Sequence, residues 1–196
     1  VTDNLSVYGE FRNNAADHGG AIYVKGQLSN SVIIAKFINN TASYGGAIYL
    51  WHDGSNLVIN STFENNVATG RGGAISIAKV SDSLINSIFK NNSAQRGGAI
   101  RFDGTFTKSN LTSVFINNIA SADGGANCFN YVNNVNISEA LPKLKQFYQK
   151  SGYMNNTPAD LFERYLKTGM GGEPMIVDYE KSIIDFANSN PEGFNQ

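Results

Sequence analysis

The sequence predicts a mainly β protein: a right-handed parallel β-helix of about five 26-residue rungs, followed by a short α-helical C-terminal segment. Three observations predict this fold: a phrase that recurs every 26 residues, an alternation of period two inside each phrase, and a change to a helical pattern after residue 137. We therefore expect β-helix repeats over residues 1–137. Residues 138–196 are expected to form an α-helical cap or the start of a following domain.

The repeat is marked by phenylalanines that stand 26 residues apart: Phe11, Phe37, Phe63, Phe89 and Phe115. Each opens a similar phrase, such as FINNTASYGGAIYL from Phe37, with Asn-Asn two residues later and Gly-Gly-Ala eight or nine residues later. An aliphatic residue stands four residues before each Phe, and a small residue stands two before it. Agreement at so many positions indicates structural units that stack on one another.

Side chains within each phrase alternate with a period of two, which is typical of β-strands. The pattern aliphatic–x–small–x–Phe places three side chains on one face of a first strand. The pair after Gly-Gly-Ala, for example Ile48 and Leu50, does the same for a second strand, and there is room for a third. Asn-Asn and Gly-Gly favour turns and positive φ. The unit is too short for a propeller blade and has no helical stripe, so a coil that climbs one rung per repeat remains.

This architecture predicts a role for each repeated residue. Rungs stack about 4.8 Å apart, so the Phe side chains should form a column inside the coil, and the small residues should make room for them. Asparagines at one position in successive rungs should form a hydrogen-bonded ladder. We place Asn39 and Asn91 in this ladder and expect both to be buried.

The repeat breaks down in a sixth rung, where Leu141 takes the position of Phe. A helical pattern follows over about residues 138–150, and it is expected to cover the open end of the coil. A second helix is expected between the Thr157-Pro158 cap and Gly169, and a third over about residues 178–188.

Composition excludes several classes of protein. The net charge of −1 and the 16% of charged residues give no basic excess for nucleic acid, and no apolar run is long enough to span a membrane. Cys128 is the only cysteine, which excludes an internal disulfide and a cysteine-based zinc site. The chain starts without Met or an apolar leader, so we expect a piece of a longer surface protein or assembly.

The paired motifs FxxN and GGAI, repeated from residue 4 to about residue 129 of this Asn-rich chain, resemble the repeat of chlamydial polymorphic outer membrane proteins. The repeats are equally similar to those of adhesin-like surface proteins from methanogenic archaea. The resemblance implies a right-handed β-helix stalk that is exposed at a cell surface and used for cell adhesion. The single cysteine departs from the chlamydial pattern.

Two columns of residues are expected to point outward from the rungs. The position before Gly-Gly holds His18, Tyr44, Arg71, Arg96 and Asp123, and the position after GGAI holds Tyr23, Tyr49, Ser76, Arg101 and Cys128. Neither column stacks the carboxylates that polysaccharide lyases and hydrolases of this fold need. We therefore expect no catalytic residues, no metal site and no cofactor. Asp103 is interpreted as the residue of an Asp-Gly turn.

These columns predict instead a ligand-binding stripe, because Tyr and Arg are enriched in binding hot spots and aromatic faces stack on sugar rings. Its expected members are His18, Tyr23, Tyr44, Tyr49, Trp51, Arg71, Arg96 and Arg101. An ordinary solvated surface is the alternative interpretation. Among seven N-x-[ST] sites, Asn60 and Asn110 are the better glycosylation candidates if the protein is exported.

The sequence thus favours a secreted or cell-surface, extracellular, non-enzymatic adhesin-like protein. Its expected partner is a glycan or protein on a host or neighbouring cell, and no nucleic acid. Two alternatives remain: a β-helix enzyme or tail-spike-like protein that acts on a surface polysaccharide, and a passive structural stalk.

Overall fold

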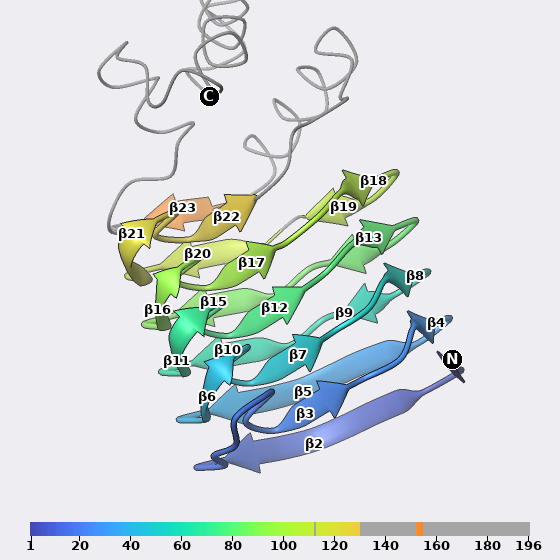
Figure 1. The fold of residues 1–196 in the computed structure, drawn as a ribbon, viewed down its shortest axis with the longest axis horizontal. Coiled ribbons are helices and arrows are strands. Elements are labelled where there is room, and N and C mark those ends of the chain that lie inside the picture. Colours follow the sequence, from blue (N-terminus) through green and yellow to red (C-terminus); the bar gives the residue numbers. More distant parts are fainter. Residues whose placement is uncertain (112, 130–151, 155–196) are drawn as a thin grey trace, which may run out of the picture.

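The computed structural model describes residues 1–111, 113–129 and 152–154. Over these residues the chain is mainly β and forms a parallel β-solenoid of about four turns, without a helix (Figure 1). The predicted parallel β-helix is therefore confirmed, whereas the count of about five rungs is not. The helices expected at residues 138–150, between Thr157 and Gly169, and at residues 178–188 lie outside the described residues.

The solenoid has four parallel sheets, in which each strand pairs with its copy in the next turn. Sheet A contains β1 (Thr2–Asp3), β4 (Leu28–Ser29), β8 (Gly54–Ser55), β13 (Val80–Ser81) and β18 (Phe106–Thr107). Sheet B contains β2 (Ser6–Arg12), β5 (Val32–Ile38), β9 (Val58–Ile59), β10 (Thr62–Glu64), β14 (Leu84–Ile85), β15 (Ile88–Lys90), β19 (Asn110–Leu111), β20 (Val114–Ile116) and β23 (Gly152–Met154). Sheet C contains β6 (Thr41–Tyr44), β11 (Val67–Arg71), β16 (Ser93–Arg96) and β21 (Ile119–Asp123). Sheet D contains β3 (Ile22–Val24), β7 (Ile48–Leu50), β12 (Ile75–Ile77), β17 (Ile100–Phe102) and β22 (Asn127–Phe129).

Sheets B and D form the two broad walls of the solenoid, and the short strands of sheets A and C close its two ends (Figure 1). The two strands expected from the period-two pattern are those of sheets B and D. Sheet C follows the Asn-Asn turn, and sheet A follows sheet D. The core lies between the walls and is filled by their inward aliphatic and aromatic side chains.

The register of the strands follows the repeat. Phe63 pairs with Phe37 on one side and Phe89 on the other, so residues 26 apart in sequence are neighbours in sheet B. The interval between successive Gly-Gly pairs is not constant, and sheet C absorbs the difference. A register shift between Val67 and Arg71 in β11 takes up the extra residue, so that sheet D remains aligned.

The phenylalanines form the predicted internal column. The rings of successive phenylalanines from Phe11 to Phe115 are stacked, with centroids 4.8–5.0 Å apart and interplanar angles of 4–8°. Phe37, Phe63 and Phe89 are completely buried. Because the centroid distance matches the spacing of paired strands, each turn carries its ring directly onto the next.

The small residues two positions before Phe do more than make room. Ser61 Oγ accepts a hydrogen bond from the Ala35 amide at 3.1 Å and donates one to the Ile33 carbonyl at 2.9 Å. Sheet B is interrupted between β9 and β10, on either side of Ser61, whereas β5 runs unbroken through Ala35. The serine hydroxyl therefore supplies hydrogen bonds at the place where the regular strand is interrupted.

The asparagine ladder is confirmed, but it is formed by the second asparagine of each pair. Asn66 is completely buried, and its side chain joins Asn40 and Asn92 in the neighbouring turns. The placement of Asn39 and Asn91 in the buried ladder was wrong: both are exposed, with φ of 56° and 54°. The first asparagine takes the left-handed turn conformation and points outward, so that only the second enters the coil.

The Gly-Gly pair lets the chain turn from sheet C into sheet D. Gly72 has φ of +63°, a conformation that a side chain strains. Gly73 packs against the next turn, and a Cβ added there would lie 2.0 Å from the Gly98 carbonyl oxygen. One glycine is required for its backbone angle and the other for close approach.

At the C-terminal end of the solenoid, β23 pairs with β20 and extends sheet B by a further strand. Tyr153 stands opposite Phe115, in the register where the sequence pattern predicts Leu141. Leu141 itself lies outside the described residues. The expected position of Asn127 is confirmed, because it pairs with Ile100.

Candidate functional site

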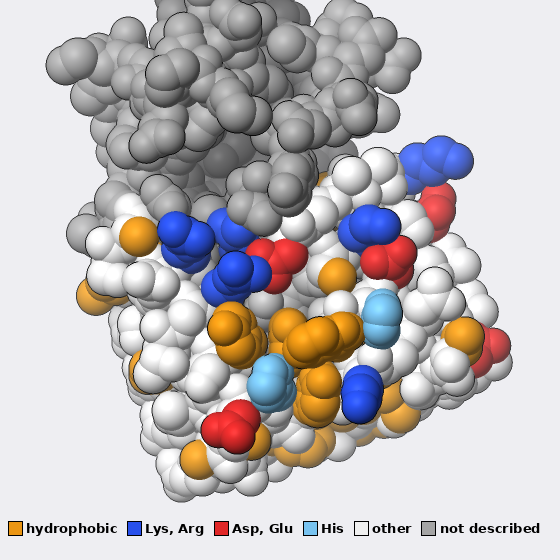
Figure 2. Space-filling view, in the orientation of Figure 1, with side chains coloured by type: hydrophobic (Ala, Val, Ile, Leu, Met, Phe, Trp, Pro, Cys, Tyr) orange, Lys and Arg blue, Asp and Glu red, His pale blue; other side chains and the backbone are white. Residues whose placement is uncertain are grey.

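Five of the predicted stripe residues, His18, Tyr23, Tyr44, Tyr49 and Trp51, form one aromatic cluster. The ring of His18 lies 5.4 Å from Tyr23, 5.5 Å from Tyr44 and 5.4 Å from Tyr49. Tyr23 and Tyr49 pair across β3 and β7, and their rings are stacked at 5.5 Å and 9°. Figure 2 shows these aromatic side chains grouped on the face where sheet D lies in Figure 1, with Lys and Arg side chains above them.

The local fold explains why two sequence columns form one cluster. His18 is bridged to Tyr44 just before the Gly-Gly turn, and Tyr23 stands in sheet D just after it. The turn at Gly19, with φ of 55°, brings the outward side chains from both sides of the corner together. Inward residues of the same strands, such as Ile48, are held in the core, so the outward ones are fixed in place.

Trp51 differs in orientation from the rest of the cluster. Its ring is tilted by 52° to His18 and by 68° to Tyr49, at 6.0 and 5.8 Å respectively. Trp51 is 47% exposed and Tyr23 42% exposed, whereas Tyr49 is half-buried between its neighbours. Trp51 therefore stands across the stack as an exposed wall.

The basic part of the site adjoins the aromatic part. The Arg71 guanidinium lies 5.9 Å from the centroid of the Tyr44 ring. Arg71 Nη1 donates a hydrogen bond to Asp103 Oδ1 at 3.1 Å, and Arg101 Nε donates to the same oxygen at 2.9 Å. We call these nine residues the aromatic–basic patch: His18, Tyr23, Tyr44, Tyr49, Trp51, Arg71, Arg96, Arg101 and Asp103.

The prediction that Arg101 is an exposed member of the stripe was wrong. Arg101 is only 2% exposed. Asp103 stands two residues further along the strand direction, on the same face, and its carboxylate holds the Arg101 side chain against the sheet. Ser76, which pairs with both Arg101 and Tyr49, is completely buried, and its hydroxyl makes no hydrogen bond among the described residues.

Arg96 lies in the turn after Arg71 and pairs with it in sheet C. It is exposed, and on its other side the register places Asp123. The structure thus brings six predicted residues into mutual contact, links Arg101 to them through Asp103, and places Arg96 at the edge. Asp103 was assigned to a turn only. Its spacing of two from Arg101 was the signal that both side chains lie on one face.

The electrostatics of the patch act on Tyr49. Burial raises the pKa of the Tyr49 hydroxyl above its ordinary value, and the nearby Asp103 carboxylate raises it further. Two guanidinium groups share the Asp103 carboxylate, so this cluster carries an excess of one positive charge.

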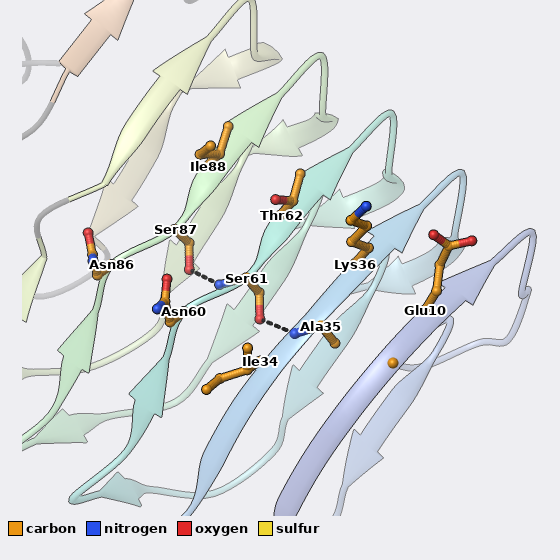
Figure 3. Close-up of a pocket in the computed structure, with 11 residues that line it drawn as sticks. Glu10, Ile34, Ala35, Lys36, Asn60, Ser61, Thr62, Asn86, Ser87 and Ile88 are labelled. Carbon is orange, nitrogen blue, oxygen red and sulfur yellow. Dashed lines mark hydrogen bonds between the residues drawn. The ribbon is translucent and has the colours of Figure 1, made fainter.

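A second surface feature is an open groove of about 500 Å³ on the outer face of sheet B (Figure 3). Its lining extends from Glu10 in β2 to Ile88 in β15, and the column of small residues that includes Ser61 lies along it. Asn60 is exposed in this groove, and the side chain of Asn110 is not among those described. Glycosylation at either asparagine stays a prediction.

Among residues 1–111, 113–129 and 152–154, no three His, Cys, Asp or Glu side chains gather closely enough to hold a metal ion. Within the same residues, no helix has the length and apolar character needed to cross a membrane.

Fold and patch together define a class: a solenoid built from sequence repeats, with an invariant interior and an aromatic–basic outer face. Four segments of the chain match the model of the Chlamydia polymorphic membrane protein repeat: residues 9–25, 35–50, 60–78 and 86–103. Each match begins next to the small residue before Phe and extends through the following strand of sheet D. The matches support the resemblance to this repeat family, while the similarity to archaeal adhesin-like proteins stays a prediction. No curated protein and no solved structure matches the chain.

Proposed function

We propose that this chain is the adhesin-like part of a secreted or cell-surface protein, and that it attaches to a neighbouring or host cell through the aromatic–basic patch without catalysing a reaction. In this proposal the chain is a right-handed β-helix of about five rungs. The matches to the polymorphic membrane protein repeat support a role at a cell surface. The observation that carries the proposal is the contiguous cluster of five aromatic side chains and Arg71.

Such a cluster has the properties of a binding surface. Tyr, Trp and Arg are the residues most enriched in binding hot spots, and Tyr and Trp supply a large contact area at a low cost in conformational entropy. Here Tyr49 is packed against His18, Tyr44 and Trp51 before any ligand arrives. A surface that is ordered in advance loses less entropy on binding than one that must be ordered by its ligand.

The patch offers little for hydrolysis or elimination. General acid–base chemistry on a polysaccharide requires carboxyl groups that are free to exchange protons with the substrate. The one carboxylate described in the patch, that of Asp103, is held by Arg71 and Arg101. Its arrangement favours attachment over turnover.

The test is incubation of the purified chain with whole cells and a panel of cell-wall polysaccharides, scoring retention and the release of shortened product together. We expect retention without product, and a roughly tenfold or greater loss of retention in Tyr49→Ala and Trp51→Ala. Tyr8→Ala is the matched control, because Tyr8 is 65% exposed on sheet B, away from the patch.

Each other outcome contradicts part of the proposal. Equal retention of all variants would move attachment away from the patch. Retention on nothing would favour a passive stalk, and shortened product would favour a β-helix enzyme.

A further inference from the structure

We propose that the aromatic–basic patch selects an acidic saccharide, a pyranose that carries a carboxylate, with the sugar ring on the aromatic cluster and the carboxylate on Arg71. This inference rests on the proposed function and names the ligand class of the same site. Three features of the patch carry it: an exposed aromatic wall, an excess of positive charge beside it, and a buried hydroxyl that makes no hydrogen bond among the described residues.

The aromatic wall is the part of the cluster that a sugar can reach. Rings that stack on each other at small angles, as Tyr23 and Tyr49 do, cover each other's faces. Trp51 stands across this stack and is 47% exposed, so one side chain combines a large apolar area with access from solvent. The C–H groups of a pyranose ring pack against such a surface, whereas a flexible peptide would have to be ordered by it.

The positive charge lies next to this wall. Arg71 lies 5.9 Å from the Tyr44 ring centroid, and its side chain is 40% exposed. Its ion pair with Asp103 does not neutralise it fully, because Arg101 donates to the same carboxylate oxygen. A guanidinium that keeps unused N–H groups and net positive surroundings favours a second carboxylate in a two-pronged hydrogen-bonded pair.

The hydroxyl of Ser76 lies beneath this charged group. Ile75 and Ile77 on either side point into the core, so Ser76 points to the outer face, between Tyr49 and Arg101. It is completely buried and makes no hydrogen bond among the described residues. A buried polar group without a partner is costly, so a ligand oxygen that reaches it between the aromatic and basic parts gains a donor already in place.

The distinguishing experiment compares carboxylated probes with matched neutral ones on the wild-type chain. Immobilised polygalacturonate is paired with its fully methyl-esterified form, and sialylated mucin glycan with the same glycan after sialic acid removal. We expect retention on at least one carboxylated probe to exceed retention on its neutral partner by roughly ten- to a hundredfold, and to fall with added salt. The two pairs distinguish a uronate from a sialate as the source of the carboxylate.

Variants then assign the carboxylate to Arg71. Arg71→Gln should abolish the preference for the carboxylated probe, and Arg71→Lys should keep part of it, since it retains the charge but loses the two-pronged geometry. Arg12→Gln is the matched control, because Arg12 is an exposed arginine of β2 that pairs with Glu10. Equal retention on charged and neutral probes would overturn the inference even if Arg71→Gln failed to fold.

The inference and the proposed function fail in different ways. If cells are retained and Trp51→Ala releases them, but carboxylated and neutral probes behave alike, the function stands and the acidic ligand is excluded. If carboxylated sugars are retained through Arg71 but no cell is, the saccharide site stands and adhesion falls.

Discussion

Replacing Asn66 by alanine tests what holds the solenoid at the corner between sheets B and C. The Asn66 side chain makes four hydrogen bonds, all at 2.9–3.0 Å. Its Oδ1 accepts from the backbone amide and from the Nδ2 of Asn40. Its Nδ2 donates to the Phe37 carbonyl and to Asn92 Oδ1. All of these groups are buried, so water does not compensate for their loss without opening the coil.

The magnitude follows from what the alanine leaves behind. The Asn40 amide loses the acceptor that the Asn66 side chain gives it, which costs about 1–3 kcal/mol for a buried donor. The other three hydrogen bonds contribute about 0.5–1.5 kcal/mol each. Asn66→Ala should therefore lower the free energy of unfolding by about 3–6 kcal/mol, or Tm by about 10–20 °C for a chain of this length.

Urea and thermal unfolding followed by circular dichroism give this difference. Asn65→Gly is the matched control, because Asn65 is exposed with φ of 55°, a conformation in which glycine is at no disadvantage. Asn65→Gly should change stability by less than about 1 kcal/mol. If Asn66→Ala is no more destabilising than this neighbour, the ladder does not stabilise the fold and the reasoning fails.

Three further predictions concern the core, the turn and the patch. Phe63→Ala should cost about 3–5 kcal/mol in denaturant unfolding, and a cost below about 1 kcal/mol would exclude a closed aromatic column. Gly73→Ala should prevent folding, judged by loss of the β circular dichroism signal, because the new Cβ would lie 2.0 Å from a backbone oxygen; Gly26→Ala, whose nearest atom is 3.7 Å away, should fold normally. Because the pKa of Tyr49 is raised above 10.0, its neutral form is favoured by folding, so stability is present below pH 10 and lost as pH rises through the folded pKa; Tyr49→Phe should reduce this alkaline loss, and an identical pH profile would contradict it.

The interior was predictable because the repeat aligns it. With no insertion between Phe11 and Phe115, the neighbour of each inward side chain is the residue 26 positions away, and the pairing of Phe63 with Phe37 and Phe89 follows. Sheet A was not predictable in this way. A strand of two residues, such as β8 (Gly54–Ser55), shows no alternation, and its turn conformation passes through Asn56 and Lys108, residue types with little in common.

The candidate site was predictable in its columns but not in its depth. Column alignment placed Tyr49 beside Tyr23, because both stand at the same position of successive rungs. It did not show that Arg101 is buried, since that depends on where the Asp103 carboxylate lies, and side-chain direction within a turn is not repeated. The pairing of adjacent asparagines posed the same difficulty: spacing alone does not tell which of Asn39 and Asn40 enters the coil.

The solenoid separates two demands on its sequence. An inward residue such as Phe63 contacts its copies above and below, so a change in one turn disturbs two others. An outward residue of sheet D meets only its local neighbours, and the column through Tyr49, Ser76 and Arg101 changes from aromatic to hydroxyl to cation without altering the register beneath it. Because the core needs nothing from this face, the composition of the face reflects what it contacts. A gradient from aromatic to basic within a few turns, roughly 15 Å along the axis, is therefore better explained by a ligand that spans it than by the requirements of folding.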